Sequence, residues 1–165
     1  MRIGEKKNFQ VTRAVELMDG LTVTVCSLPF GFQEQMEEDL PSPVAPEIAK
    51  RDPHGNPVYK DKSRNIIDVV KNEEDPAYKK AAAAQNKRQA AWIIYHGTMS
   101  DKSIQWETAG TLSKEQFFEA IYGELKASGI GAGYIIQLQM AILEVSGMGK
   151  EQIEKARAAF LSAEA

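Results

Sequence analysis

The sequence contains few of the side chains from which catalytic and metal sites are built. Its 165 residues include a single cysteine, Cys26, and two histidines, His54 and His96. One cysteine cannot form a disulfide framework, and these residues supply neither a zinc-ligand cluster nor a Ser-His-Asp arrangement. We expect Cys26 to be a buried, unreactive thiol. We therefore expect no catalytic residue, no metal, no cofactor and no enzymatic activity.

Long apolar runs and a strong excess of one charge are also missing. No run approaches the roughly 18 apolar residues of a membrane span, and the first residues, MRIGEKKNFQ, lack the apolar core of a secretory signal. The 20 Lys and Arg residues against 23 Asp and Glu residues leave a net charge of −3, without the excess positive charge typical of nucleic-acid-binding proteins. We expect a soluble intracellular protein with no membrane and no nucleic acid as partner.

Proline is scarce except in the middle of the chain. Six of the seven prolines lie from Pro41 to Pro76, a spacing that excludes long regular structure and favours an extended arm. The chain therefore divides into three predicted parts. They are an N-terminal β-hairpin with a short acidic helix at residues 1–40, a proline-rich connecting arm at 41–74 and a helical domain at 75–165. This is a mainly α (α+β) fold.

Residues 11–28 alternate between apolar and polar side chains, as two β-strands do. Asp19 and Gly20 are typical turn residues, and a three-residue loop ending at Gly20 collects the aliphatic side chains on one face. That register pairs Val15 with Val23 and Leu17 with Leu21. Because two strands alone are marginal in water, the apolar face must pack on the helices or on a partner.

A corner and a short helix follow the hairpin. Pro29 interrupts the second strand, and a helix is predicted over Gln33–Asp39 with Met36 on its apolar side and its acidic residues on the other. Phe30 and Phe32 have two interpretations. Either they attach this corner to the core, or they form part of a partner-binding patch.

Two segments of the arm have a recognisable pattern. Asp52–Pro57 is dense in turn residues, which predicts a small exposed hairpin. Ile66–Val70 contains a cluster of aliphatic side chains, which can dock this part of the chain. We expect the arm to lie outside the core.

The longest helix signal covers Asp75–Gly97. Asp75 suits the N-cap, Pro76 suits the first helical position, and Gly97 stands where a left-handed C-cap is expected. Alanines dominate its first half, and Trp92 belongs to a more apolar second half. The segment predicts a helix that crosses a small domain.

Three further helices are expected after a loop. The first begins at Ser113, which forms a capping box with Gln116, and the others cover about Gly133–Ser146 and Lys150–Ser162. The side chains predicted to face inward are Phe117, Phe118, Ile121, Leu125, Tyr134, Ile135, Leu138, Ala141, Ile142, Val145, Ala156, Phe160 and Leu161. Together with the preceding helix they predict a C-terminal bundle of about four helices.

Several segments together resemble the tail assembly chaperones of long-tailed bacteriophages. The segments are the strand LTVTVCSLPFGF (Leu21–Phe32), the acidic helix leading into LPSPVAP, the polar arm ending in Asp75-Pro76-Ala77-Tyr78, and the Trp92–Gly97 end of the long helix. The resemblance implies a non-enzymatic protein of the host cytoplasm, absent from the mature virion. Such a protein binds the tape-measure protein and recruits tail-tube subunits.

Apolar side chains are the candidate contacts for such a partner. The candidate partner-binding residues are Phe30, Phe32, Met36, Trp92, Tyr95 and Trp106. Aromatic residues at helical spacing also commonly belong to a core, so both interpretations remain open. The oligomeric state remains open as well.

Two other functions are compatible with the sequence. One is a structural phage component, such as a head–tail connector or minor tail protein, which stays in the virion. The other is a regulatory helical protein that associates with nucleic acid through the basic residues of the long helix. Those residues are Lys79, Lys80, Lys87 and Arg88.

Overall fold

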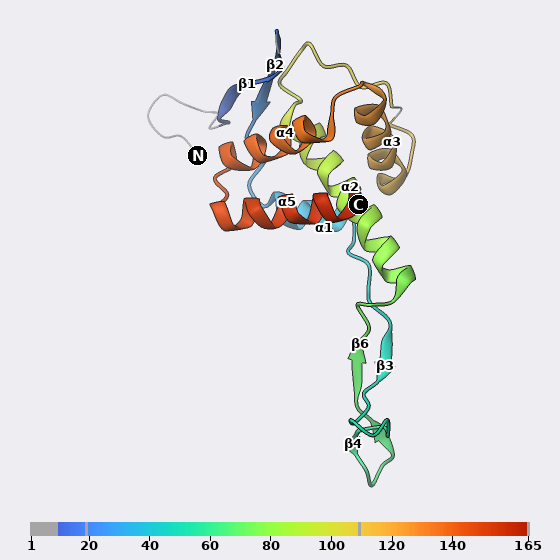
Figure 1. The fold of residues 1–165 in the computed structure, drawn as a ribbon. Helices are drawn as coiled ribbons and strands as arrows, with labels where there is room; N and C mark the ends of the chain where they lie inside the picture. The colour runs from blue at the N-terminus through green and yellow to red at the C-terminus, as the bar shows by residue number, and fades with distance from the viewer. Residues whose placement is uncertain (1–9, 19, 109, 165) are drawn as a thin grey trace. The chain divides into compact units, whose positions relative to one another are not determined.

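The computed structural model describes residues 10–18, 20–108 and 110–164, and within them the fold is mainly helical. It contains five helices and three two-stranded antiparallel sheets in these residues (Figure 1), in agreement with the predicted α+β class. The chain forms two compact units, which we call the helical unit (Met1–Pro41 with Ala83–Ala165) and the arm unit (Ser42–Ala82).

The N-terminal hairpin of the helical unit joins β1 (Thr12–Met18) to β2 (Leu21–Cys26). Val15 lies opposite Val23 as predicted, but Met18, and not Leu17, lies opposite Leu21, because the register shifts between Glu16 and Met18. Such a bulge keeps Leu17 buried on the apolar face while Leu21 is 37% exposed. The predicted pairing of Leu17 with Leu21 is therefore wrong.

Single residues explain the turn of this hairpin and the hydrogen bonds along the free side of β2. Gly20 has φ 78°, the predicted left-handed conformation. Because Met18 lies opposite Leu21, two residues and not the predicted three connect the strands, and one of them, Asp19, lies outside the described residues. The backbone N–H of Thr24 donates to Asp101 Oδ2 at 2.6 Å, and that of Leu28 donates to Ser146 Oγ at 2.9 Å. Side chains from distant loops therefore satisfy the edge of β2.

A short helix and a long helix follow in the helical unit. Helix α1 (Phe32–Asp39) forms where it was predicted. Helix α2 (Pro76–Gly97) contains the boundary between the units and begins as expected, because Asp75 Oδ1 accepts from the Tyr78 N–H at 2.9 Å. Every residue from Ala90 to Ile94 is buried, so the second half of α2 is surrounded on all sides.

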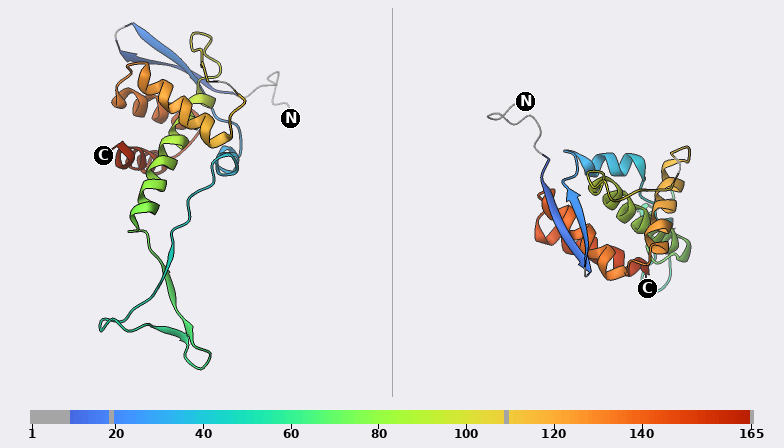
Figure 2. Two further views of the ribbon diagram at one scale, coloured as in Figure 1. Left: turned by 90° about the vertical axis from the view of Figure 1, so that its right-hand side faces the viewer. Right: turned by 90° about the horizontal axis from the view of Figure 1, so that it is seen from above.

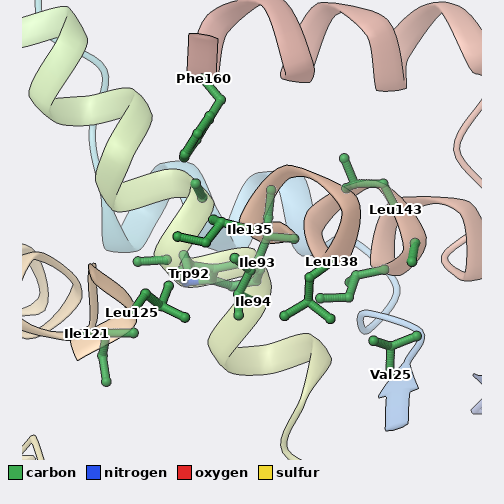
Figure 3. Packing of buried hydrophobic residues seen from close by; sticks show 14 of the residues in the cluster. Val25, Trp92, Ile93, Ile94, Ile121, Leu125, Ile135, Leu138, Leu143 and Phe160 are labelled. Carbon is green, nitrogen blue, oxygen red and sulfur yellow. The ribbon is translucent and has the colours of Figure 1, made fainter. Parts of the chain in front are cut away.

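Three further helices complete the helical unit. They are α3 (Lys114–Ala127), α4 (Ala132–Val145) and α5 (Lys150–Glu164). The capping box of Ser113 and Gln116 is present as predicted. Figure 3 shows buried side chains from α2, α3, α4, α5 and β2, which belong to one core cluster, and the hairpin packs on α4 (Figure 2).

Two side chains predicted to face inward are exposed. Tyr134 is 37% exposed because it belongs to the first turn of α4, beside an open hollow at the end of the hairpin. Leu161 is 48% exposed, since the buried stripe of α5 runs through Ile153 and Phe160 and a helix turns by about 100° per residue. The prediction was wrong for both residues.

The arm unit is made of short paired strands. Strand β3 (Glu47–Ala49) pairs with β6 (Val69–Lys71), and β4 (Tyr59–Asp61) pairs with β5 (Ile66–Ile67). The predicted turn forms after Arg51, which bridges to Pro57. The Asp52 side chain closes this turn by accepting the N–H groups of His54 and Asn56.

Gly97 allows two helices to pack closely, and it does not form a left-handed cap. It is not among the residues with positive φ, so the predicted C-cap is wrong. A Cβ atom added at Gly97 would lie 2.5 Å from the side chain of Ile142 on α4, which is itself fully buried. Glycine therefore lets α2 and α4 approach at this point.

We predict that Gly97→Ala lowers the free energy of unfolding by about 1–3 kcal/mol, because the β-branched Ile142 side chain has no space to move. Helix propensity alone predicts the opposite sign. Gly123→Ala on α3 is the control: its Cβ meets nothing within 4 Å, and we expect a gain of about 0.5–1 kcal/mol. Urea denaturation measures both, and a neutral or stabilising Gly97→Ala would contradict the packing argument.

Candidate partner-binding surfaces

The six candidate partner-binding residues lie in different environments. Phe30 is fully exposed, whereas Phe32, Met36, Tyr95 and Trp106 are partly buried against the core. Trp92 is completely buried. The structure brings Phe32 and Met36 to one small cleft and Tyr95 to Trp106, but it does not join all six in one site.

Trp92 is part of a polar connection inside the helical unit. Its indole Nε1 donates to Asp39 Oδ2 at 2.9 Å, and Asp39 Oδ1 lies 3.3 Å from Lys114 Nζ. The indole N–H and the carboxylate are thereby both satisfied near the core. Trp92 is not at the surface for a partner to contact; it joins α2 to the end of α1.

Tyr95 and Trp106 also have a structural explanation. The Tyr95 ring lies 5.2 Å from that of Phe117 and 5.8 Å from that of Trp106, measured between centroids. Edge-to-face and tilted aromatic pairs at these distances stabilise packing. The loop before α3 is therefore held to α2 by aromatic contacts.

Phe30 lines an open hollow of the helical unit, which we call the corner cleft. This open cleft has a volume of about 850 Å³. Its apolar lining comes from the corner after β2, the loop after α2 and the end of α4; the residues are Val11, Leu28, Phe30, Met99 and Val145. Met99 is 66% exposed, and sequence analysis missed it because nothing in the local pattern marks its loop as the neighbour of the corner. The cleft can accept apolar side chains.

His96 lines the same cleft from α2. Its ring lies 4.2 Å from the Trp92 ring between centroids, and its Nε2 is buried without a hydrogen-bond partner in the described part of the chain. Burial lowers the pKa of His96 below its ordinary value, with Asp39 opposing the shift and Lys114 adding to it. The structure therefore favours a neutral imidazole.

Cys26 is buried, as predicted. Its Sγ lies 3.6 Å from the backbone carbonyl oxygen of His96, to which the thiol can donate. This contact ties the end of β2 to α2. Burial of this kind is typical of a structural thiol.

Helix α1 exposes an acidic surface. Its sequence, FQEQMEED, contains no basic residue. Glu34 and Glu38 are exposed and have no ion-pair or hydrogen-bond partner among the described residues. Glu34 Oε2 lies 3.7 Å from the position that a Cβ would take at Gly31, so this carboxylate lies beside the corner. We call Glu34 and Glu38 the acidic face.

The arm unit has almost no core of its own. Within residues 42–82, all of which the structure describes, Ala45 is the one buried residue. The exposed large apolar side chains of this unit are Val44, Ile48, Tyr59, Ile66, Ile67, Val69 and Val70. The predicted aliphatic cluster at 66–70 thus lies at the surface of the arm unit.

The basic residues of α2 are largely paired. Arg88 lies 3.2 Å from Glu119 and 3.8 Å from Glu115, and Lys79 pairs with Glu74. Lys87 Nζ lies 6.0 Å from the centre of the Tyr122 ring. These contacts leave less free positive charge on α2 than the sequence alone indicates.

Metal binding and membrane insertion are two further possibilities to compare with the described residues. No group of three or more His, Cys, Asp and Glu side chains that could hold a metal ion occurs in the described ranges. Among the helices described, none combines the length and the apolar content needed to cross a membrane.

We predict that the protein loses stability as the pH falls below about 6.5, the ordinary pKa of His96. Above that pH the ring is neutral in both states. Below it the unfolded chain binds the proton more readily than the folded chain, so the free energy of unfolding decreases. The carboxylates with lowered pKa (Asp52, Asp61 and Asp101) titrate below 3.8 and do not contribute in this window.

The measurement is urea denaturation at about pH 7.5 and about pH 5. His96→Gln cannot titrate and should reduce the difference in stability between the two pH values. His54→Gln, at an exposed position of the arm unit, is the control and should leave the difference unchanged. An equal loss in wild type and His96→Gln would show that His96 is not the group responsible.

Comparison with known proteins gives no relative from which a function can be carried over. No family model, curated protein sequence or solved structure matched this chain significantly. Function must be inferred from the surfaces of the chain and from the segments that resemble tail assembly chaperones.

Proposed function

We propose that this protein is a non-enzymatic tail assembly chaperone of a long-tailed bacteriophage, which binds the tape-measure protein and recruits tail-tube subunits. Two features support this function. The sequence segments that resemble the family correspond to a strand pair, an acidic helix, an arm unit and a helical unit. The second feature is the apolar surface of the arm unit, and it carries the proposal.

The arm unit presents aliphatic side chains that nothing in the unit covers. Ile48 and Val70 are paired across β3 and β6 on one face and are 46% and 40% exposed, and Val69 on the opposite face is 47% exposed. Two-stranded ribbons are marginal in water unless a further layer packs on them. An exposed aliphatic group on such a ribbon is therefore a typical protein-binding surface.

Covering this ribbon would supply part of the energy of reversible binding. Full burial of one Val or Ile side chain contributes about 1.5–3 kcal/mol. Ile48 and Val70 are about half exposed, so a partner on their face of the ribbon would gain about 1 kcal/mol from each. A chaperone must release its partner during assembly, and contacts of this size suit transient association.

The kind of partner follows from what the ribbon offers. Its aliphatic side chains can cover the apolar stripe of an amphipathic helix, and its strand edges offer backbone hydrogen bonds to an extended segment. A long helical protein that aggregates on its own, such as a tape-measure protein, presents apolar stripes of this kind. No chemical step is required of the chaperone.

We predict that co-expression with a tape-measure protein keeps that protein soluble. Ile48→Thr/Val70→Thr should reduce the soluble tape-measure protein several-fold, because threonine keeps the β-branched shape but removes apolar contact area. Leu112→Gln/Leu161→Gln is the matched control, since it removes two exposed aliphatic side chains from the helical unit. The readout is the soluble fraction after centrifugation, with circular dichroism to verify the fold of each variant.

Two results would refute this proposal. One is a tape-measure protein that precipitates equally with and without wild-type protein, across all of its fragments. The other is the presence of this chain in purified virions by mass spectrometry, which would indicate a structural phage component.

A further inference from the structure

We infer that the small cleft beside Phe32 and Met36, which we call the Gln139 pocket, binds the side chain of a tyrosine on a basic segment of a partner protein. The pocket lies between α1, α2, α4 and α5, and all of its lining residues belong to the helical unit. The inference depends on one buried amide without a partner and on the size of the pocket. It does not require the proposed function, which depends on the arm unit.

Gln139 is buried although its carboxamide oxygen is not satisfied. The residue is 5% exposed, and its Oε1 has no hydrogen-bond partner among the described residues. The other buried residues of α4 are apolar, and Gln139 continues the helical stripe that contains Ile135 and Ile142. Burying an acceptor without a partner costs stability. This position therefore favours a ligand that supplies a hydrogen-bond donor.

The rest of the lining is mostly apolar. Its apolar residues are Phe32, Met36, Ile93, Leu143, Met148 and Phe160. Gln33, Asn86 and Gln89 also line the pocket, and Gln33 is exposed, so the pocket reaches the surface beside α1. The flexible methionine side chains can adjust to the shape of a ligand. An apolar ligand with one polar group suits such a lining.

The size of the pocket favours a single side chain over a whole small molecule. Its volume is about 100 Å³, whereas pockets that bind small molecules commonly measure about 300–1,000 Å³. A closed cavity of about 150 Å³ binds benzene, so an open pocket of this size can hold most of one ring. Pockets that accept one aromatic side chain of a partner are common at the centres of protein interfaces.

Tyrosine meets both requirements. Its ring is apolar, and its hydroxyl can donate to Gln139 Oε1. Phenylalanine has no donor, tryptophan is larger, and lysine or arginine would bring a charge into a pocket whose lining includes no acidic residue. Helix α1, which forms one wall, contains four acidic residues and no basic one. This charge favours lysine or arginine on either side of the tyrosine.

The experiment is an NMR titration of the isotope-labelled full chain with the acetylated and amidated peptide Lys-Lys-Tyr-Lys-Lys. We expect weak binding that shifts the side-chain amide signals of Gln139. The matched peptide with phenylalanine in place of tyrosine should bind roughly three- to tenfold more weakly, because it cannot donate the hydrogen bond. A peptide with alanine at this place should leave the Gln139 signals unchanged.

Gln139→Leu distinguishes a ligand-binding role from a structural one. Leucine removes the acceptor, so the tyrosine and phenylalanine peptides should bind this variant equally, as followed by the backbone signals of Gln33 and Gln89. Because Oε1 has no partner in the described part of the free protein, the variant should resist urea at least as well as wild type. A glutamine needed for the fold would instead lose stability on this change.

The matched control is Gln35→Leu, at an exposed position of α1 that does not line the pocket, and it should keep the preference for tyrosine. Equal binding of the two aromatic peptides to wild type, absence of binding, or a preference that persists in Gln139→Leu would overturn the inference. A further titration uses p-cresol, which has the ring and hydroxyl of tyrosine without its backbone. Binding of p-cresol without binding of the tyrosine peptide would assign the pocket to a small phenol and also overturn the inference. None of these measurements involves the tape-measure protein, so this inference and the proposed function can fail separately.

Discussion

The helical unit depends on burial of the second half of α2 on every side. From Ala90 to Ile94 no residue reaches solvent, so α1, α3, α4 and α5 must all cover it. Two consecutive alanines allow close approach on two sides, and Trp92 fills the space between α1 and α3. Two polar groups that this burial encloses are satisfied, since the Trp92 N–H reaches Asp39 and Gln85 donates to the Leu40 carbonyl. Burial of α2 thus determines where its neighbours lie.

Local chemistry explains which parts of the fold were predictable. The start of α2 at Pro76, the capping box at Ser113 and the left-handed Gly20 depend on a few neighbouring residues, and all three were predicted. Gly97 was misread because a local pattern cannot distinguish a cap from a close helix contact. That distinction depends on Ile142, which lies 45 residues later in the chain.

The candidate surfaces were less predictable than the fold, because exposure depends on long-range packing. Phe30 and Phe32 stand two residues apart and have similar patterns around them, yet Phe32 packs on the core and Phe30 projects fully into solvent. Gly31, with φ 75°, reverses the chain direction between them. Sequence analysis correctly kept both interpretations open. The acidic residues of α1 are visible in the sequence, whereas the position of Glu34 beside Gly31 and of Met99 in the corner cleft depends on the fold.

The near-neutral charge of the chain conceals a separation of charge. A net charge of −3 suggests a mixed surface, yet α1 has acidic residues and no basic one, whereas residues 58–67 have three basic residues against one acidic. Arg88 with Glu119 and Arg13 with Glu144 show that other charges are paired within the helical unit. Charge of opposite sign is therefore separated between α1 and residues 58–67. Composition gives only the sum of these charges, so it could not reveal the separation.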